Sequence, residues 1–245
     1  MKSTERFTHR ADDYAASRPS YPIATIDALF DGLPPAAECT VVDLGAGTGI
    51  SSRLFAARTA RVIAVEPNAA MAAKGSADAA IRWQIATAEH TGLTAKSADL
   101  VTAFQAFHWF DYDAAIAEMV RLLRPGGHAA IVYNERDEHD PFTAAYGTIV
   151  RAFATEATEQ CRADGRAAFE RSGAWSAIRY SSTIHAQPLE RTGLHARVRG
   201  TSYLPNDGPE AERLHAELDE LFERFSRDEC VTMMMAAAAT IATPR

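Results

Sequence analysis

The chain has 245 residues, of which 47% are hydrophobic and 23% charged, and its formal net charge is −7. This length suits one large α/β domain or two small ones, and the composition is that of an ordinary globular protein. The acidic balance argues against nucleic acid as the main partner, because a surface that follows a phosphate backbone needs clustered positive charge.

The first half of the chain alternates between helical segments and short apolar runs. Residues 8–17 and 23–30 are predicted helices, because Pro19 would end the first and Pro22 fits the first turn of the second. Apolar runs then predict strands at residues 40–44, 61–66, 81–86, 99–105 and 128–133. Helices are expected between them at residues 50–57, 68–74 and from 111 onward. Strands that alternate with helices predict a parallel, doubly wound sheet with helices on both faces.

The pattern changes after residue 133. The expected elements are a helix at 141–157, a strand at 178–189, a mixed segment at 190–204, a helix at 209–227 and a last strand at 231–243, whose alanines would equally suit a helix. We expect one domain over residues 1–245. It would comprise an N-terminal helical cap at 1–35, a cofactor-binding core at 36–135 and a C-terminal part at 136–245.

Residues 41–49 are the most informative stretch, a buried strand that runs into a glycine turn with Asp43 at the junction. Gly45 and Gly47 would let the backbone turn tightly and approach a ligand closely. A loop built for phosphate should not place a negative charge beside its ligand, whereas a loop built for a cationic ligand can. The spacing is G-x-G-x-G, with Ile50 where a third glycine of a dinucleotide loop would fall. The stretch favours a cationic, nucleoside-like cofactor.

Five segments together resemble the class I S-adenosylmethionine-dependent methyltransferases. They occur in the family's order, at residues 41–49, 62–66, 86–90, 104–110 and 121–127. Within that family the chain looks most similar to small-molecule enzymes of the trans-aconitate methyltransferase-like group, whose members often begin with a pattern like Phe7, Tyr14, Arg18-Pro19 and Tyr21-Pro22. The resemblance covers about residues 5–135. It implies a Rossmann-like, mostly parallel seven-stranded sheet, with S-adenosylmethionine as cofactor and S-adenosylhomocysteine as product.

The resemblance assigns cofactor contacts along the carboxyl ends of the strands. Asp43 suits the cationic methionine end, directly or through a water, while Gly45 and Gly47 lie against the cofactor. Glu66 can accept two hydrogen bonds from the ribose hydroxyls. The remaining expected contacts are Pro67, Asn68 and Met71 near the ribose and adenine, Ala88 and Glu89 at the adenine, and Gln105 and Ala106 at the methionine moiety. Many relatives carry an aspartate close to Thr87, so adenine recognition here is expected to rest on the two residues that follow.

The N-terminal helix is expected to close over the cofactor, as it does in similar proteins. Tyr14 and Arg18 would then contact the cofactor. The guanidinium of Arg18 could pair with the cofactor's carboxylate through two hydrogen bonds. The alternative for Arg18 is a surface salt bridge. Tyr21 is expected to face the acceptor.

The aromatic segment at residues 104–110 suggests the site of methyl transfer. His108 is the best candidate base, since its unperturbed pKa is close to neutral, and Trp109 would lie near the methyl group or the acceptor. His108 could instead only pack or hydrogen-bond, and a carboxylate acceptor would need no base. An acceptor lid is expected at about residues 141–160 and 190–227, where Arg191, His195, Arg197, Arg199 and Tyr203 would suit an anionic substrate.

Further features of the sequence indicate the cellular compartment in which the protein is expected. Cys39, Cys161 and Cys230 are far apart and odd in number, which disfavours a disulfide framework or a metal site and favours a reducing compartment. The N-terminus lacks the apolar core of a signal peptide, and residues 231–242 are too few to span a bilayer. We expect a cytoplasmic monomer or homodimer without a membrane partner.

The expected reaction is in-line methyl transfer to a small molecule, at the oxygen of an acid or phenol, with nitrogen or carbon of a specialised metabolite as the alternative. Three rival functions stay open. They are a protein of this fold that binds the cofactor without transferring methyl, an NAD-dependent oxidoreductase and a nucleic-acid methyltransferase. Asp43 and the missing third glycine oppose the oxidoreductase. Net acidity and the lack of an Asn/Asp-Pro-Pro-Tyr/Phe motif after residue 105 oppose the nucleic-acid enzyme.

Overall fold

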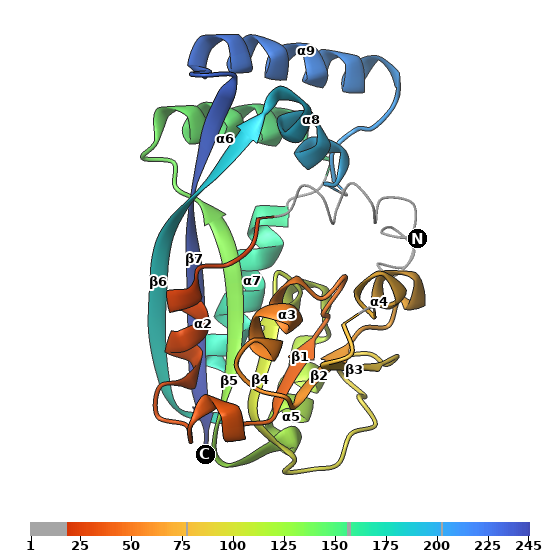
Figure 1. Cartoon of the computed structure of the whole chain (residues 1–245), viewed down its shortest axis with the longest axis vertical. Helices are drawn as coiled ribbons and strands as arrows, with labels where there is room; N and C mark the ends of the chain where they lie inside the picture. The colour runs from red at the N-terminus through yellow and green to blue at the C-terminus, as the bar shows by residue number, and fades with distance from the viewer. Residues whose placement is uncertain (1–18, 77, 156–157, 202) are drawn as a thin grey trace.

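The computed structural model describes residues 19–76, 78–155, 158–201 and 203–245 (Figure 1). The expectations for the helix at 8–17, and for Tyr14 and Arg18 in particular, lie outside the described residues. Within the described part, no helix is both long and apolar enough to cross a membrane.

The described strands form one seven-stranded sheet in the order β3-β2-β1-β4-β5-β7-β6. Their bounds are β1 Val41–Leu44, β2 Val62–Val65, β3 Ile81–Gln84, β4 Ala98–Phe104, β5 Leu123–Arg136, β6 Trp175–Glu190 and β7 Cys230–Pro244. The first five strands run parallel, whereas β7 is antiparallel to both β5 and β6. The mostly parallel, seven-stranded sheet expected from the sequence is confirmed.

Helices cover both faces of this sheet (Figure 1). On one face, α2 (Ile23–Phe30) and α3 (Ile50–Ala56) bury Ile26 and Phe55 against the strands. On the other, α5 (Tyr112–Leu122) and α7 (Thr158–Arg171) bury Met119 and Phe169. Full burial of one such side chain contributes about 1.5–3 kcal/mol, so these two layers hold the strand ends in fixed positions. The helix α4 (Ala69–Gly75) follows β2, and short 3-10 turns lie at η2 (Ala36–Glu38) and η3 (Phe107–Trp109).

A second apolar core is formed between three helices, seen at the top of Figure 1, and the end of β6 and the start of β7. These helices are α6 (Pro141–Phe153), α8 (Arg191–Arg199) and α9 (Gly208–Phe225). Phe142, Leu194 and Leu218 from the helices pack with Met233 and Met235 of β7. The long outer strands therefore extend beyond the parallel part of the sheet and carry this helical layer.

Two expectations for the second half were wrong. The helix expected at 141–157 ends at Phe153, and a separate helix, α7, occupies 158–171, where none was expected. The mixed segment begins with the helix α8. By contrast, the strand expected at 231–243 is confirmed over the alternative helix, because β7 hydrogen-bonds to β5 and β6 on either side.

Candidate active site

Two cavities lie beyond the carboxyl ends of the parallel strands, where open α/β sheets bind ligands. The smaller has a volume of about 190 Å³ and the larger about 380 Å³. Both are lined by Gly45, Gly47, Phe104 and Gln105. We call these four residues the junction of the two cavities.

The glycine turn after β1 forms one wall of this junction. Gly45 and Gly47 have φ angles of +64° and +59°, in the left-handed region that favours glycine. A Cβ on Gly45 would lie 2.7 Å from the Cβ of Ala106 and 3.0 Å from Phe110. The turn therefore requires glycine both for its backbone conformation and for the close approach of the chain that follows β4.

Asp43 lies beneath the turn and does not line either cavity. Its fully buried carboxylate accepts hydrogen bonds from the hydroxyls of Ser51 and Ser52, both at 2.6 Å, and of Thr102 at 3.0 Å. Burial raises the pKa of this carboxyl, and the three hydroxyl donors oppose the rise. The expected direct contact with a cationic ligand does not fit this position. Asp43 instead ties β1, α3 and β4 together below the turn.

Glu66 follows β2 and lines the smaller cavity. Its two carboxylate oxygens accept the backbone N–H groups of Gly47 and Asn68, each at 2.9 Å. Each oxygen keeps a further lone pair, so the carboxylate can also accept hydrogen bonds from two vicinal hydroxyls. Burial raises the pKa of Glu66, while the two backbone donors lower it in part.

The rest of the smaller cavity brings together most of the residues predicted to bind the cofactor. The side chain of Asn68 caps α4 by accepting the N–H groups of Ala70 and Met71 at 3.0 and 3.3 Å. Other lining residues are Pro67, Met71, Thr87, Ala88, Glu89, Ala106, Trp109 and Phe110. Apolar and aromatic side chains suit a flat base, and Glu66 suits a ribose diol. The cavity thus offers the groups that a nucleoside needs.

Gln105 is the one junction residue with a long polar side chain. Its φ of +51° is unusual for a residue other than glycine, and such backbone strain gathers at functional sites. Its backbone N–H donates to Val132 at 2.9 Å, and its side-chain amide donates to the backbone oxygen of Asn134 at 3.0 Å. Both contacts are to β5, which holds Gln105 at the point where the cavities meet.

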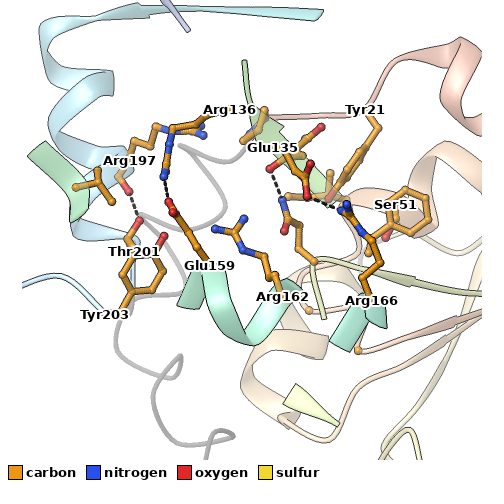
Figure 2. Close-up of a pocket in the computed structure, with 18 of the residues that line it drawn as sticks. Tyr21, Ser51, Glu135, Arg136, Glu159, Arg162, Arg166, Arg197, Thr201 and Tyr203 are labelled. Carbon is orange, nitrogen blue, oxygen red and sulfur yellow. Dashed lines mark hydrogen bonds and ion pairs between the residues drawn. The ribbon is translucent and has the colours of Figure 1, made fainter. Parts of the chain in front are cut away.

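The larger cavity is walled mainly by residues 134–203 and is rich in charge (Figure 2). Five arginines and three glutamates line it: Arg136, Arg151, Arg162, Arg166 and Arg197, with Glu135, Glu138 and Glu159. Its lining residues thus carry a net positive charge. They come from β5, the loop that follows it, α6, α7 and α8.

Four of these arginines are engaged with neighbouring side chains. Arg136 pairs with Glu159, and Arg151 donates to both oxygens of Glu138 at 2.6 and 3.1 Å. The Arg151 guanidinium lowers the pKa of the Glu138 carboxyl. In addition, Arg166 pairs with Glu135, and Arg197 donates to Gln187 at 2.6 Å.

The residues predicted to bind the acceptor divide between the cavities. Tyr21, Arg197 and Tyr203 line the larger cavity, as an acceptor contact would require, whereas Trp109 lines only the smaller one. The ring of Tyr21 packs edge-on against Phe104 with centroids 4.7 Å apart. Of the basic lid residues named from the sequence, only Arg197 lines a cavity. Arg191 and His195 instead contact Asp219 on α9, at 2.7 and 3.0 Å.

His108, the candidate base, lines neither cavity. Its ring packs against Trp109 and Tyr133 with centroids 4.7 and 5.8 Å away, and Gly165 of α7 lies against its backbone. The position corresponds to the packing alternative, and the structure does not bring this imidazole to the junction.

The sequence did not identify the charged wall on α7. Glu159, Arg162, Ala163 and Arg166 all line the larger cavity and follow the i, i+3, i+4, i+7 spacing of one helix face. That spacing was the available signal, but no helix was expected there. Arg136, Glu135 and Glu138, at the end of β5 and just beyond it, were missed because β5 was expected to end at residue 133.

Comparisons with known proteins identify the family. Residues 42–131 match the family model described as a methyltransferase domain. The chain is 30% identical to an uncharacterized methyltransferase-like protein of Schizosaccharomyces pombe over 220 residues, which cover 88% of this chain and 85% of the relative. The chain belongs to the S-adenosylmethionine-dependent methyltransferases. An uncharacterized methyltransferase of Mycobacterium tuberculosis is 41% identical over 140 residues, 56% of this chain and 55% of the relative.

The fold of this methyltransferase recurs in solved structures. A candidate type II methyltransferase from Anaeromyxobacter dehalogenans superposes with a TM-score of 0.71 at 24% identity, covering 93% of this chain and 97% of the other. The methyl donor is S-adenosylmethionine, and the carboxylate and apolar wall of the smaller cavity fit its nucleoside. The family model stops at residue 131, so it does not reach the part of the larger cavity wall that begins at Asn134.

Proposed function

We propose that this methyltransferase moves the methyl group of S-adenosylmethionine to an oxygen of a small anionic molecule, with a carboxylate preferred over a phenol. One observation carries the proposal: a nucleoside-sized cavity and a larger, net positive cavity meet at Gln105 and the glycine turn. Donor and acceptor can therefore approach each other from opposite sides of one junction.

On the donor side, Glu66 would hold the ribose, and Met71, Ala88 and Glu89 would surround the adenine. Gly45 and Gly47 would lie against the methionine moiety, with Asp43 supporting their turn from below. The contacts expected of Tyr14 and Arg18 belong to the same proposal on the resemblance alone. The sulfonium of the cofactor is already an activated leaving group, so positioning can supply most of the catalysis.

On the acceptor side, the charge of the cavity favours an anion. Five lining arginines exceed three lining glutamates, and four of the arginines already have partners. The expected lid enters here, because α6 and α8 supply Arg151, Arg197 and part of the cavity wall. A small acid would also agree with the resemblance to the trans-aconitate methyltransferase-like group.

The choice of carboxylate over phenol follows from the residues around the cavity. Its described lining residues include no histidine, lysine or cysteine, the side chains best suited to accept a proton from a phenol near neutral pH. A carboxylic acid is already ionised at that pH and needs no base. His108 lines neither cavity, so it does not change this argument.

The test is to incubate the purified full chain with S-adenosylmethionine and three acceptor sets of similar size: carboxylic acids, phenols and amines. S-adenosylhomocysteine formation gives the rate, and mass spectrometry detects the added methyl group. Mild alkali distinguishes the products, because it cleaves a methyl ester but leaves a methyl ether or methylamine intact. We expect alkali-labile products from acids. Turnover of only phenols or amines would refute the proposal.

A further inference from the structure

We infer that Arg162 binds a second anionic group of the acceptor, one that does not receive the methyl. The inference rests on the proposed function and deepens it. It makes the acceptor bifunctional, with a reacting oxygen at the junction and a separate anion on α7, and it makes Arg162 a specificity-determining residue.

Arg162 is a cation on the wall of the larger cavity. Its side chain is half-buried and lines the larger cavity. Figure 2 shows it pointing into the cavity between the Arg136–Glu159 pair and the Glu135–Arg166 pair. Among the residues that the structure describes, it forms no ion pair or hydrogen bond, although it lies within a wall that contains three carboxylates.

The three carboxylates of that wall each pair with another arginine. Glu159 precedes Arg162 by three residues and is its natural partner along a helix, yet it pairs with Arg136. Glu138 is bound by both guanidinium nitrogens of Arg151, and Glu135 by Arg166. The neighbouring charges are thus neutralised in pairs, and Arg162 is left without a partner among the described residues. A half-buried cation without a partner is costly unless a ligand supplies the anion.

Arg162 is not one of the residues at the junction, where the methyl group is transferred. The donor methyl group must reach the acceptor where the cavities meet, and the four junction residues carry no charge. Arg162 lines only the larger cavity. A carboxylate held bidentately by a guanidinium also has its lone pairs engaged, which makes it a poor nucleophile. The anion on Arg162 is therefore a different group from the oxygen that is methylated.

The experiment compares acids of equal length with one or two carboxylates. Adipate and hexanoate serve as the matched pair, with glutarate and pentanoate as a second pair. For the unaltered chain, we expect kcat/KM to be higher for the dicarboxylate by about tenfold or more, as for one charge-assisted hydrogen-bonded pair. Arg162→Gln should remove this preference by raising KM for adipate, with little change in kcat or in the rate with hexanoate.

Two further variants separate binding from a structural effect. Arg162→Lys keeps the charge without the fork and should restore part of the preference. Arg171→Gln removes the same charge from an exposed position on the same helix that lines neither cavity, and should leave both acids unaffected. An equal loss for adipate and hexanoate in Arg162→Gln, or no loss for either, would overturn the inference while leaving the proposed function intact.

A second readout does not require turnover. Adipate is titrated calorimetrically into the complex of the protein with S-adenosylhomocysteine, using the unaltered chain and Arg162→Gln. We expect binding to the first and at least tenfold weaker binding to the second. If phenols or amines are methylated and no acid is, the proposed function fails. This titration then judges Arg162 by itself, and equal binding to both proteins counts against the inference.

Discussion

The carboxylate of Glu66 accepts the backbone N–H of Gly47 at 2.9 Å, joining residues 19 positions apart in the sequence. The other oxygen of Glu66 holds the N–H of Asn68, which begins the turn into α4. The group best placed to bind a ribose is therefore also the group that fixes the glycine turn. Changes at Glu66 should affect both halves of the cofactor site at once.

Replacing Glu66 should weaken cofactor binding more than folding. In Glu66→Gln, the new amide group faces a backbone N–H donor and can accept fewer hydrogen bonds, so we expect S-adenosylhomocysteine affinity to fall by about tenfold to a hundredfold. Calorimetric titration measures the affinity, and Glu38→Gln, at an exposed position away from both cavities, is the matched control. Unchanged affinity in Glu66→Gln would contradict the ribose assignment.

Cofactor affinity should also depend on pH through Glu66. Its pKa is raised above the usual 4.5 by burial, so in the free protein it takes up a proton at a higher pH than an ordinary glutamate. The cofactor hydroxyls need the ionised form as acceptor. Affinity should therefore be full above the raised pKa and decline as pH falls through it. Titrations from neutral pH downward toward 4.5 should show this decline, and Glu66→Gln should flatten it.

We expect Asp43 to stabilise the fold and not to contact the cofactor directly. Asp43→Ala leaves three buried hydroxyls without their acceptor, and each unsatisfied group costs about 1–3 kcal/mol, so thermal unfolding should shift strongly downward. Asp43→Asn keeps one acceptor oxygen and the shape, and should unfold close to the unaltered protein. If both variants fold normally and only lose cofactor affinity, the direct contact first expected from the sequence would be correct.

The two glycines of the turn should differ in their tolerance of alanine. Both have positive φ, so each substitution introduces backbone strain of about 1–2 kcal/mol. At Gly47 the added Cβ meets only the end of the Met71 side chain at 3.5 Å, whereas at Gly45 it would clash with Ala106 at 2.7 Å. Gly45→Ala should therefore lower the melting temperature more than Gly47→Ala. Equal melting temperatures would show that the segment after β4 can move aside.

The fold and the donor side of the site could be predicted because their signals are local. The buried strand at 41–44 passes directly into glycines with positive φ, and Glu66 directly follows the next strand. In a parallel sheet such ends meet at one edge, so sequence order alone places them together. Asp43 shows the limit: the sequence indicates a carboxylate at the turn, but not that Ser51, Ser52 and Thr102 face it.

The acceptor side could not be predicted in the same way because it depends on tertiary contacts. The segment 158–171 is highly charged and contains Gly165, which weakens an isolated helix by about 1 kcal/mol relative to alanine. The helix forms there because it packs on η3, where a Cβ at Gly165 would already lie 3.4 Å from His108. Without α7 in the prediction, Arg162 and Arg166 could not be assigned to any wall.

The order of the chain separates the two cavities almost completely. Apart from Pro19, Tyr21 and the segment around the junction, the wall of the larger cavity comes from residues 134–203, and the smaller cavity uses residues 45–110 alone. A chimera that takes everything after residue 133 from a relative would exchange the acceptor wall as one continuous piece. Substrate preference in such proteins can therefore diverge by recombination at a single crossover, with the donor pocket inherited unchanged.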